Sequence, residues 1–183
     1  MTTERLMHIL RMNLRRTSSG RANYLKKKHL FAAIGDQVKY QPRMIPLYPE
    51  LIKLHSNIMV GAGVRFVTHD AVHTVLNRMN MGSFPEQIGC IEVMDNVFIG
   101  ADTTIMPNVR IGSNVIIGAN SLVTKDCEDN SVYAGIPARR IGSFDDYVAK
   151  RQKGGYPTGS RNQRLTQAQQ QFAWEYFRQT RNS

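Results

Sequence analysis

The 183-residue sequence has little cysteine and no long apolar run. Cys90 and Cys127 have no metal-ligand spacing and make no disulfide framework, so we interpret both as small buried or half-buried residues. No apolar stretch of about 18 residues and no secretory segment is found. We therefore expect a cytoplasmic protein of one domain plus appendages, and 20.8 kDa is enough for a hydrophobic core.

Acidic residues are also scarce, because 14 Asp and Glu stand against 24 Lys and Arg and give a net charge of +10. This excess favours an anionic partner such as a nucleotide sugar, acidic polysaccharide, nucleic acid or a membrane surface, and charge alone does not rank them. Aromatic and basic residues do not alternate as in single-strand-binding proteins, and no nucleic-acid motif is present. We therefore expect no nucleic-acid partner. Gly61-Ala62-Gly63 is too short for a dinucleotide-binding motif.

What the sequence does have is a repeat of six residues from Val93 to Asp126. The first position of each hexad is aliphatic, the fourth is always Asn or Asp, and the fifth is small or β-branched. The aliphatic positions are Val93, Ile99, Ile105, Ile111, Ile117 and Val123; the Asn or Asp positions are Asn96, Asp102, Asn108, Asn114, Asn120 and Asp126; the small positions are Val97, Thr103, Val109, Val115 and Ser121.

This spacing excludes a helix, because six steps of about 100° scatter the aliphatic residues around its axis. Short strands joined by bends fit instead, since Asn and Asp tolerate the left-handed αL conformation that a sharp corner requires. Hexapeptide periodicity is typical of a parallel β-helix, in which each coil buries its aliphatic residues by stacking on the next. Three hexads per coil would stack Ile99 on Ile117, and Ile105 on Val123, about 4.8 Å apart.

The hexads are followed by Val123-Thr124-Lys125-Asp126 and by Ala134-Gly135-Ile136-Pro137-Ala138-Arg139. Together they resemble the hexapeptide-repeat acyltransferases, within them the sugar O-acetyltransferase branch typified by galactoside and maltose acetyltransferases. The resemblance covers residues 54–142. It implies an all-β solenoid, a left-handed parallel β-helix, that assembles as a homotrimer and uses acetyl-CoA. The left-handed sense comes from the resemblance, because β-crossovers are otherwise nearly always right-handed.

We expect three parts: an N-terminal helical segment (1–33), a β-helix domain (34–142) with a protruding loop (70–90), and a C-terminal helical tail (143–183). In the first part Leu6, Ile9, Leu10 and Leu14 share one face of a basic amphipathic helix that ends before Thr17-Ser18-Ser19-Gly20. This helix either packs on the end or flank of the solenoid or lies on a membrane, and packing is favoured.

The hexad frame decays through the proline-rich residues 40–50 and recovers at Leu54, Val60 and Phe66. Asn57 and Gly63 take the corner positions there, and His69 takes the next. His also tolerates αL, so we expect a corner at His69 whose side chain faces a groove. The frame then stops until Ile91, which predicts a functional loop protruding from one face.

A corner histidine before a protruding loop resembles the catalytic histidine of the sugar acetyltransferases, and His69 is the matching residue. A neutral imidazole can take the proton of an acceptor hydroxyl as it attacks the thioester. His73 is an alternative base, and Asp70, where the family often has Pro, is a candidate to orient the imidazole. We expect the oxyanion donor to be a backbone N–H near Gly100 or Ala101.

The resemblance also implies a site for acetyl-CoA. Ala101 and Ala119 match the small residues along the pantetheine arm, Thr124 and Lys125 match the contacts at the adenine end, and Arg139 matches the residue that faces the phosphates of CoA. Basic side chains also suit phosphate oxygens on physical grounds. No metal is expected.

The tail contains two helix starts, at Ser143 with Asp146 and at Thr166 with Gln169, separated by a flexible linker at 154–160. The last helix has several aromatic residues that we expect to dock on the β-helix or on a neighbouring subunit. These are Phe172, Trp174, Tyr176 and Phe177.

The sequence thus predicts an acetyl-CoA-dependent O-acetyltransferase of a carbohydrate hydroxyl, such as a surface-polysaccharide or sugar precursor. N-acetylation of an amino sugar and acetylation of a streptogramin- or chloramphenicol-type compound remain alternatives. A metalloenzyme like the γ-type carbonic anhydrases would need three histidines, of which His55, His69 and His73 are the candidates. A non-catalytic β-helix scaffold is disfavoured by the Thr124-Lys125 and Arg139 motifs.

Overall fold

The computed structural model describes residues 3–155, 157–159 and 164–181. The chain forms two compact units, Met1–Tyr147 and Val148–Ser183. The first unit holds every strand of the described residues, and the second holds the end of α4 and all of α5.

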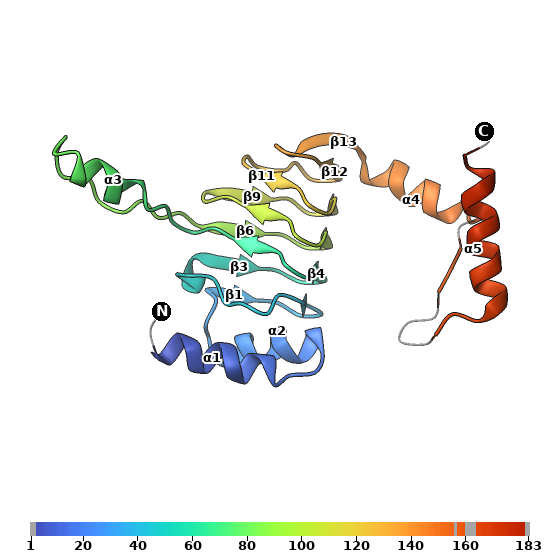
Figure 1. Ribbon diagram of the computed structural model, residues 1–183, viewed down its shortest axis with the longest axis horizontal. Coiled ribbons are helices and arrows are strands. Elements are labelled where there is room, and N and C mark those ends of the chain that lie inside the picture. The colour runs from blue at the N-terminus through green and yellow to red at the C-terminus, as the bar shows by residue number, and fades with distance from the viewer. Residues whose placement is uncertain (1–2, 156, 160–163, 182–183) are drawn as a thin grey trace. The chain divides into compact units, whose positions relative to one another are not determined.

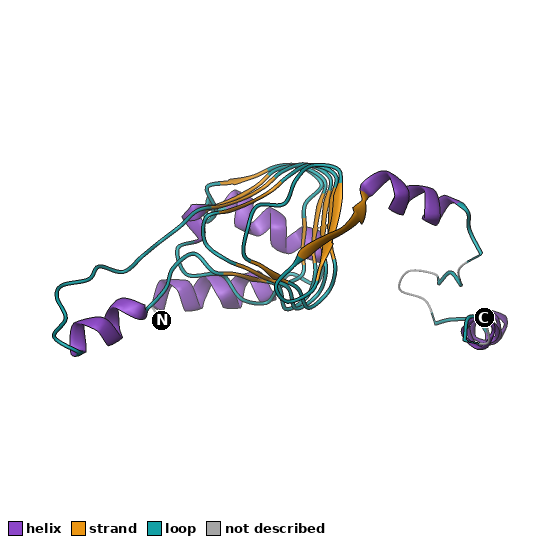
Figure 2. Ribbon diagram, turned by 90° about the horizontal axis from the view of Figure 1, so that it is seen from above, coloured by secondary structure: helices purple, strands orange, loops and turns teal. Residues whose placement is uncertain are grey.

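The core of the first unit is a stack of coils whose strands form three sheets, one on each side (Figures 1 and 2). The first face contains β1 (Ala33–Ile34), β3 (Ile52–Leu54), β6 (Ile91–Val93) and β9 (Val109–Ile111). The second face contains β2 (Lys39–Tyr40), β4 (Ile58–Val60), β7 (Val97–Ile99), β10 (Val115–Ile117), β12 (Ser131–Ala134) and β13 (Arg139–Ser143). The third face contains β5 (Arg65–Phe66), β8 (Thr104–Ile105) and β11 (Leu122–Val123).

From β3 to β11, successive strands visit the three faces in turn, and each pairs in parallel with the strand one coil away. The unit is therefore a three-sided parallel β-helix, as the hexads predict. The antiparallel pair of β12 with β13 is the exception, and the sequence analysis did not predict β13.

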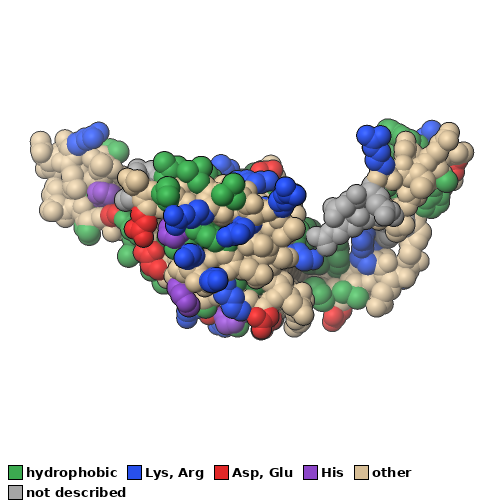
Figure 3. Space-filling view, turned by 90° about the horizontal axis from the view of Figure 1, so that it is seen from below, with side chains coloured by type: hydrophobic (Ala, Val, Ile, Leu, Met, Phe, Trp, Pro, Cys, Tyr) green, Lys and Arg blue, Asp and Glu red, His purple; other side chains and the backbone are tan. Residues whose placement is uncertain are grey.

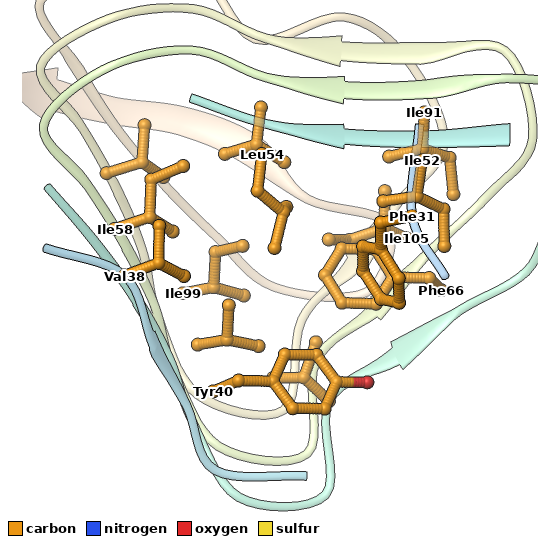
Figure 4. Packing of buried hydrophobic residues seen from close by; sticks show 14 of the residues in the cluster. Phe31, Val38, Tyr40, Ile52, Leu54, Ile58, Phe66, Ile91, Ile99 and Ile105 are labelled. Carbon is orange, nitrogen blue, oxygen red and sulfur yellow. The ribbon is translucent and has the colours of Figure 1, made fainter. Parts of the chain in front are cut away.

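The predicted stacking of aliphatic residues is confirmed. Ile99 pairs with Ile117, and Ile105 pairs with Val123. All six aliphatic hexad positions are at most 1% exposed. Figure 4 shows two of them, Ile99 and Ile105, together with Phe31, Tyr40 and Phe66 from the earlier coils, pointing into the interior. Because each residue covers the one in the next coil, the stack forms one continuous core.

The corners are mostly as predicted, because positive φ angles occur where the repeat has Asn, Asp or Gly. These residues are Asn57, Gly63, Asn96, Asp102, Asn108, Asn114 and Asn120. Asp126 and His69 are not among the positive-φ residues, so the αL corner predicted at each of them is wrong. At His69 the reason is that the chain leaves the coil in an extended conformation and pairs with Ile88. At Asp126 the hexads end, and the carboxylate instead accepts a hydrogen bond from the Arg110 amide (2.8 Å).

Two helices, α1 (Thr3–Asn13) and α2 (Ser18–Lys27), lie at the N-terminal end of the stack (Figure 1). The predicted end of the first helix before Thr17 is confirmed. Thr17 caps a second helix, α2, which was not predicted. The prediction that Leu6, Leu10 and Leu14 share a buried face with Ile9 is wrong, because these three leucines are exposed. The buried residues of α1 are Ile9 and Met12. The reason is that α2 shares the covering of the first coil, where Arg21 donates to the Tyr40 carbonyl (3.0 Å).

Basic side chains gather at this end of the β-helix unit. Figure 3 shows Lys and Arg spread over the middle of the underside of the unit, with Asp and Glu mostly toward its margins. One basic residue, Lys26 of α2, is paired with Asp36 (2.8 Å). In the part of the chain that the structure describes, no helix has the length and apolar content needed to cross a bilayer.

The predicted excursion after His69 is present and contains a short helix, α3 (Val72–Arg78), that lies away from the coils (Figures 1 and 2). After the end of β2 at Tyr40, the proline-rich segment contains only the start of a 3-10 turn, η1 (Pro49–Leu51). Both irregular segments reach the same corner of the β-helix, beside His69.

The tail contains the predicted helix starts. α4 (Phe144–Gln152) begins where the Asp146 amide donates to Ser143 Oγ (3.0 Å), and α5 (Gln167–Gln179) begins with a capping box of Thr166 and Gln169. Tyr156 and Ser160 of the predicted linker lie outside the described residues. Trp174 and Phe177 stack edge to face at 5.5 Å. The docking of the aromatic side chains on another surface stays a prediction.

Candidate active site at the His69 corner

His69 lies where the chain leaves the third face for the protruding loop. Two backbone hydrogen bonds join the two arms of the loop around it: Asp70 N–H donates to the Gln87 carbonyl (3.0 Å) and Gly89 N–H donates to the Thr68 carbonyl (2.8 Å). His69 is half-buried, so its ring is neither sealed in the core nor free in solvent. His69 therefore lies at the edge of the prism, with a backbone conformation that differs from the expected one. That its side chain faces a groove stays a prediction.

Tyr48 packs against His69, with ring centroids 5.7 Å apart and ring planes at 90°. The Tyr48 hydroxyl donates a hydrogen bond to Glu86 Oε2 in the loop (2.9 Å), and this bond, with partial burial and the charges of Glu86 and Glu50, raises the pKa of Tyr48. Neither Tyr48 nor Glu86 was among the predicted site residues. Tyr48 falls in the proline-rich segment where the hexad frame is lost, so no periodicity pointed to it.

The other residues expected around the base make contacts within the protruding loop. The Asp70 carboxylate accepts a hydrogen bond from the Val72 amide at the start of α3 (3.1 Å). His73 lies on α3 and lines a cavity of about 160 Å³ with Asp70 and Phe84. The Nδ1 atoms of His69 and His73 are both buried without a hydrogen-bond partner.

The strand register places His69 and Lys125 at one edge of the third face, and Ala101 and Ala119 at its other edge. Phe66 pairs with Ile105, which pairs with Val123. His69 lies three residues after Phe66, and Asp126 lies three residues after Val123, so the two occupy the same edge of the third face. Lys125, next to Asp126, lies at that edge too. Ala101 and Ala119 lie on the other edge of the third face, between β7 and β8 and between β10 and β11.

Lys125 and Arg139 line one cavity of about 360 Å³, together with Arg140 and Tyr133. Lys125, predicted at the adenine end, and Arg139, predicted to face the phosphates, thus line the same cavity. Arg140 adds a third cation that was not predicted. Thr124 is exposed beside them and is not among the lining residues. Three cationic side chains around one cavity suit an anionic phosphate ligand.

Cys127 lines the same cavity but is a poor nucleophile. Burial, with the neighbouring Asp126 charge, raises the pKa of its thiol to about 12. Because the thiolate is the reactive form of cysteine, this residue stays inert near neutral pH. Cys90 is exposed, so the interpretation of a small buried residue holds for Cys127 alone.

The second edge is tightly packed around Gly100. A Cβ atom on Gly100 would lie 2.4 Å from the Ala119 backbone nitrogen, so only glycine fits there. The Gly100 N–H donates to the Ile117 carbonyl (2.8 Å) and is not available as an oxyanion donor. Of the two predicted donors, the Ala101 N–H is the remaining candidate.

The His55, His69 and His73 set proposed for a metal is not brought together. His55 lies beyond β3 on the first face and contacts Glu92 (3.1 Å), which also faces Arg110 (3.7 Å). Among the described residues no three His, Cys, Asp or Glu side chains form a group that could hold a metal ion.

A further cavity of about 330 Å³ lies between α1 and the proline-rich segment. Its lining includes Glu4, Arg5 and His8 from the helix and Tyr48 and Glu50 from the segment. Tyr48 therefore touches both this cavity and the His69 ring.

Comparisons with known proteins agree with this architecture. Residues 91–125 match the family described as "Bacterial transferase hexapeptide (six repeats)". Galactoside O-acetyltransferase from Escherichia coli is 40% identical over 97 residues, which are 52% of this chain and 45% of that protein. YvoF from Bacillus subtilis is 28% identical over 137 residues, 73% of each chain. The chain therefore spans less than half of the galactoside enzyme and most of YvoF.

Among solved structures, a hexapeptide-repeat-containing acetyltransferase from Vibrio cholerae has a TM-score of 0.61 at 21% identity. The match covers 78% of this chain and 89% of that one. At this identity the similarity shows a shared fold and nothing more. The repeat, the three-sided β-helix and these relatives identify the chain as a hexapeptide-repeat protein that is similar to the sugar O-acetyltransferases of the hexapeptide-repeat acyltransferase family.

Proposed function

We propose that this protein transfers the acetyl group of acetyl-CoA to a hydroxyl of a carbohydrate, such as a sugar or a surface-polysaccharide precursor, with His69 as general base. The observation that carries the proposal is the half-buried His69 at one edge of the β-helix, together with the basic cavity that Lys125, Arg139 and Arg140 line after the last hexad. The similarity to galactoside O-acetyltransferase supports both the donor and the acceptor class.

In the reaction, neutral His69 accepts the proton of the acceptor hydroxyl while the oxygen attacks the thioester carbonyl. The Ala101 N–H of a neighbouring chain is our candidate to stabilise the resulting oxyanion. The intermediate then collapses, the C–S bond breaks, and the imidazolium returns the proton to the departing thiolate. The products are the acetyl ester and CoA. The inert thiol of Cys127 agrees with direct transfer rather than a cysteine acyl-enzyme.

The proposed assembly is a homotrimer of left-handed β-helices with sites between subunits. Within one chain, His69 lies on a different edge from Ala101 and Ala119, so a neighbouring chain is needed to bring all three around one thioester. An apolar row on the outside of the second face supports such a contact. Phe98 is 45% exposed and lies in register between Met59 and Ile116.

An acceptor screen that follows release of free CoA from acetyl-CoA tests donor and acceptor together. The panel contains neutral sugars, amino sugars, polysaccharide fragments, chloramphenicol and a streptogramin. We expect CoA release above hydrolysis with a sugar that offers only hydroxyl groups. Turnover confined to amino sugars or to the two xenobiotics would contradict O-acetylation of a carbohydrate, and no turnover with any acceptor would contradict the activity.

A further inference from the structure

Three segments that are far apart in sequence interlock around His69. The Thr68 hydroxyl donates a hydrogen bond to the Leu47 carbonyl, which holds the proline-rich segment against the strand that leads to His69. On the other side, the bridge between His69 and Ile88 fixes the base of the protruding loop. Tyr48 and Glu86, one from each flanking segment, then close the arrangement with their own hydrogen bond.

Tyr48 has an unusual backbone. Its φ and ψ are 50° and 55°, a left-handed conformation that an aromatic residue adopts at an energetic cost. Such a conformation persists only where the surroundings hold it. In this conformation the Tyr48 ring packs perpendicular to the His69 ring, and its hydroxyl reaches Glu86.

The His69 ring has no polar anchor of its own. Its Nδ1 atom is buried without a partner, and no hydrogen bond to the His69 ring is found within the described residues. A histidine that acts as a base is commonly oriented by a carboxylate or carbonyl on its second nitrogen. Because the Asp70 carboxylate instead binds the Val72 amide, the orientation of His69 depends on packing.

We propose that Tyr48 is the positioning residue of His69: its ring holds the imidazole in the orientation that receives the acceptor proton, and Glu86 holds Tyr48. This inference rests on the proposed function, in which His69 is the base. Tyr48 is a positioning residue because it acts through the imidazole rather than on the reacting atoms. The Tyr48 ring and the imidazole meet in the T-shaped geometry that aromatic pairs favour.

A double-mutant comparison tests this role. We expect Tyr48→Ala to lower kcat by about 10- to 100-fold, because small displacements of a catalytic group are costly, and to change the KM for acetyl-CoA by less than about 3-fold. In a His69→Ala background the same substitution should cause no further loss, since there is no imidazole left to position. An equal fold-loss of kcat in both backgrounds, or a rise of the acceptor KM alone, would overturn the proposal.

Tyr48→Phe separates positioning from folding. This variant keeps the ring and removes the hydroxyl, so we expect kcat to stay within about 5-fold of the wild type. A loss as large as that of Tyr48→Ala would contradict positioning by the ring. Exposed Tyr147 supplies the matched control, since Tyr147→Ala should leave kcat unchanged. Thermal melting and solution mass of each variant verify that it is folded and assembled.

Activity of the two single variants distinguishes the role of Tyr48 from that of His69. If His69→Ala transfers acetyl groups at the wild-type rate, the base assignment is wrong. If His69→Ala is impaired while Tyr48→Ala is not, only the role of Tyr48 is wrong.

Discussion

At the scale of single residues, the candidate site combines groups that the sequence marks and groups that it does not. His69, Lys125 and Arg139 follow motifs of fixed spacing, and two of them line one cavity. Tyr48 and Glu86 are 38 residues apart and follow no pattern, because the contact between them depends on how two irregular segments fold. Irregular segments carry no periodic signal, so their mutual packing could not be predicted from the sequence.

Lys125 and Arg139 supply a test of the cofactor site. If they bind the phosphates of CoA, Lys125→Ala and Arg139→Ala should each weaken CoA binding by about 10-fold, the usual order for a charge-assisted contact. Binding of acetyl-pantetheine, which lacks the nucleotide, should be unchanged. Calorimetry with both ligands measures the difference, and Lys53→Ala on the first face is the control. Equal weakening of both ligands would place these residues elsewhere than at the phosphates.

At the scale of structural elements, one column of corners is joined by side-chain hydrogen bonds. Asn57 donates to Asn96 (2.9 Å), Asn96 to Asn114 (2.9 Å), and Asn114 to Asn130 (2.8 Å). All four have positive φ. Each asparagine therefore has two roles, since it tolerates the αL conformation and bonds to the corner of a neighbouring coil. Asn96 and Asn114 bond to the coils on both sides.

Substitution of Asn114 separates these two contributions. Asn114→Ala loses the hydrogen bonds and places an unfavourable residue in αL, so we expect a decrease of about 2–3 kcal/mol in the free energy of unfolding. Asn114→Gly loses only the hydrogen bonds and should cost about 1 kcal/mol. Urea denaturation at fixed protein concentration measures both values. An equal decrease in the free energy of unfolding for both variants would show that the αL conformation at Asn114 does not add to the cost of the alanine substitution.

The elements that follow the repeat were predictable, and those outside it were less so. Ile99 and Ile117 stack as the hexads require, because one spacing determines both strand and corner. β13 was missed, since Arg139 and Arg140 look like surface charge rather than a strand. The corner at His69 was predicted in the right place with the wrong backbone, because the pairing with Ile88 is a contact across the loop.

At the scale of the whole molecule, the proposed site needs two chains. One chain offers His69 on one edge, and Ala101 and Ala119 lie on another. In the proposed trimer, each site would combine His69 of one subunit with the alanine edge of its neighbour. The sequence predicted both sets of residues through the family resemblance, but hexad spacing alone does not say which edges meet.

Trimers that mix two variants test whether each site is shared between two subunits. His69→Ala and Ala119→Trp chains, each inactive alone, are unfolded together and refolded as mixed trimers. If sites are shared, some of them join an intact His69 with an intact alanine edge, so we expect activity to return to roughly a quarter of the wild-type level, the share expected for random mixing of equal amounts. Activity no higher than that of the separate variants would show that each site lies within one chain.

The central claim is that His69 removes the proton from a carbohydrate hydroxyl as acetyl-CoA is attacked. The most direct measurement is transfer of a ¹³C-labelled acetyl group from acetyl-CoA to the best sugar of the screen, followed by NMR for wild type and His69→Ala. We predict a sugar O-acetyl ester whose rate of formation falls by about 10²–10⁴-fold in the folded, assembled variant. Ester formation at the wild-type rate without the imidazole would contradict the account.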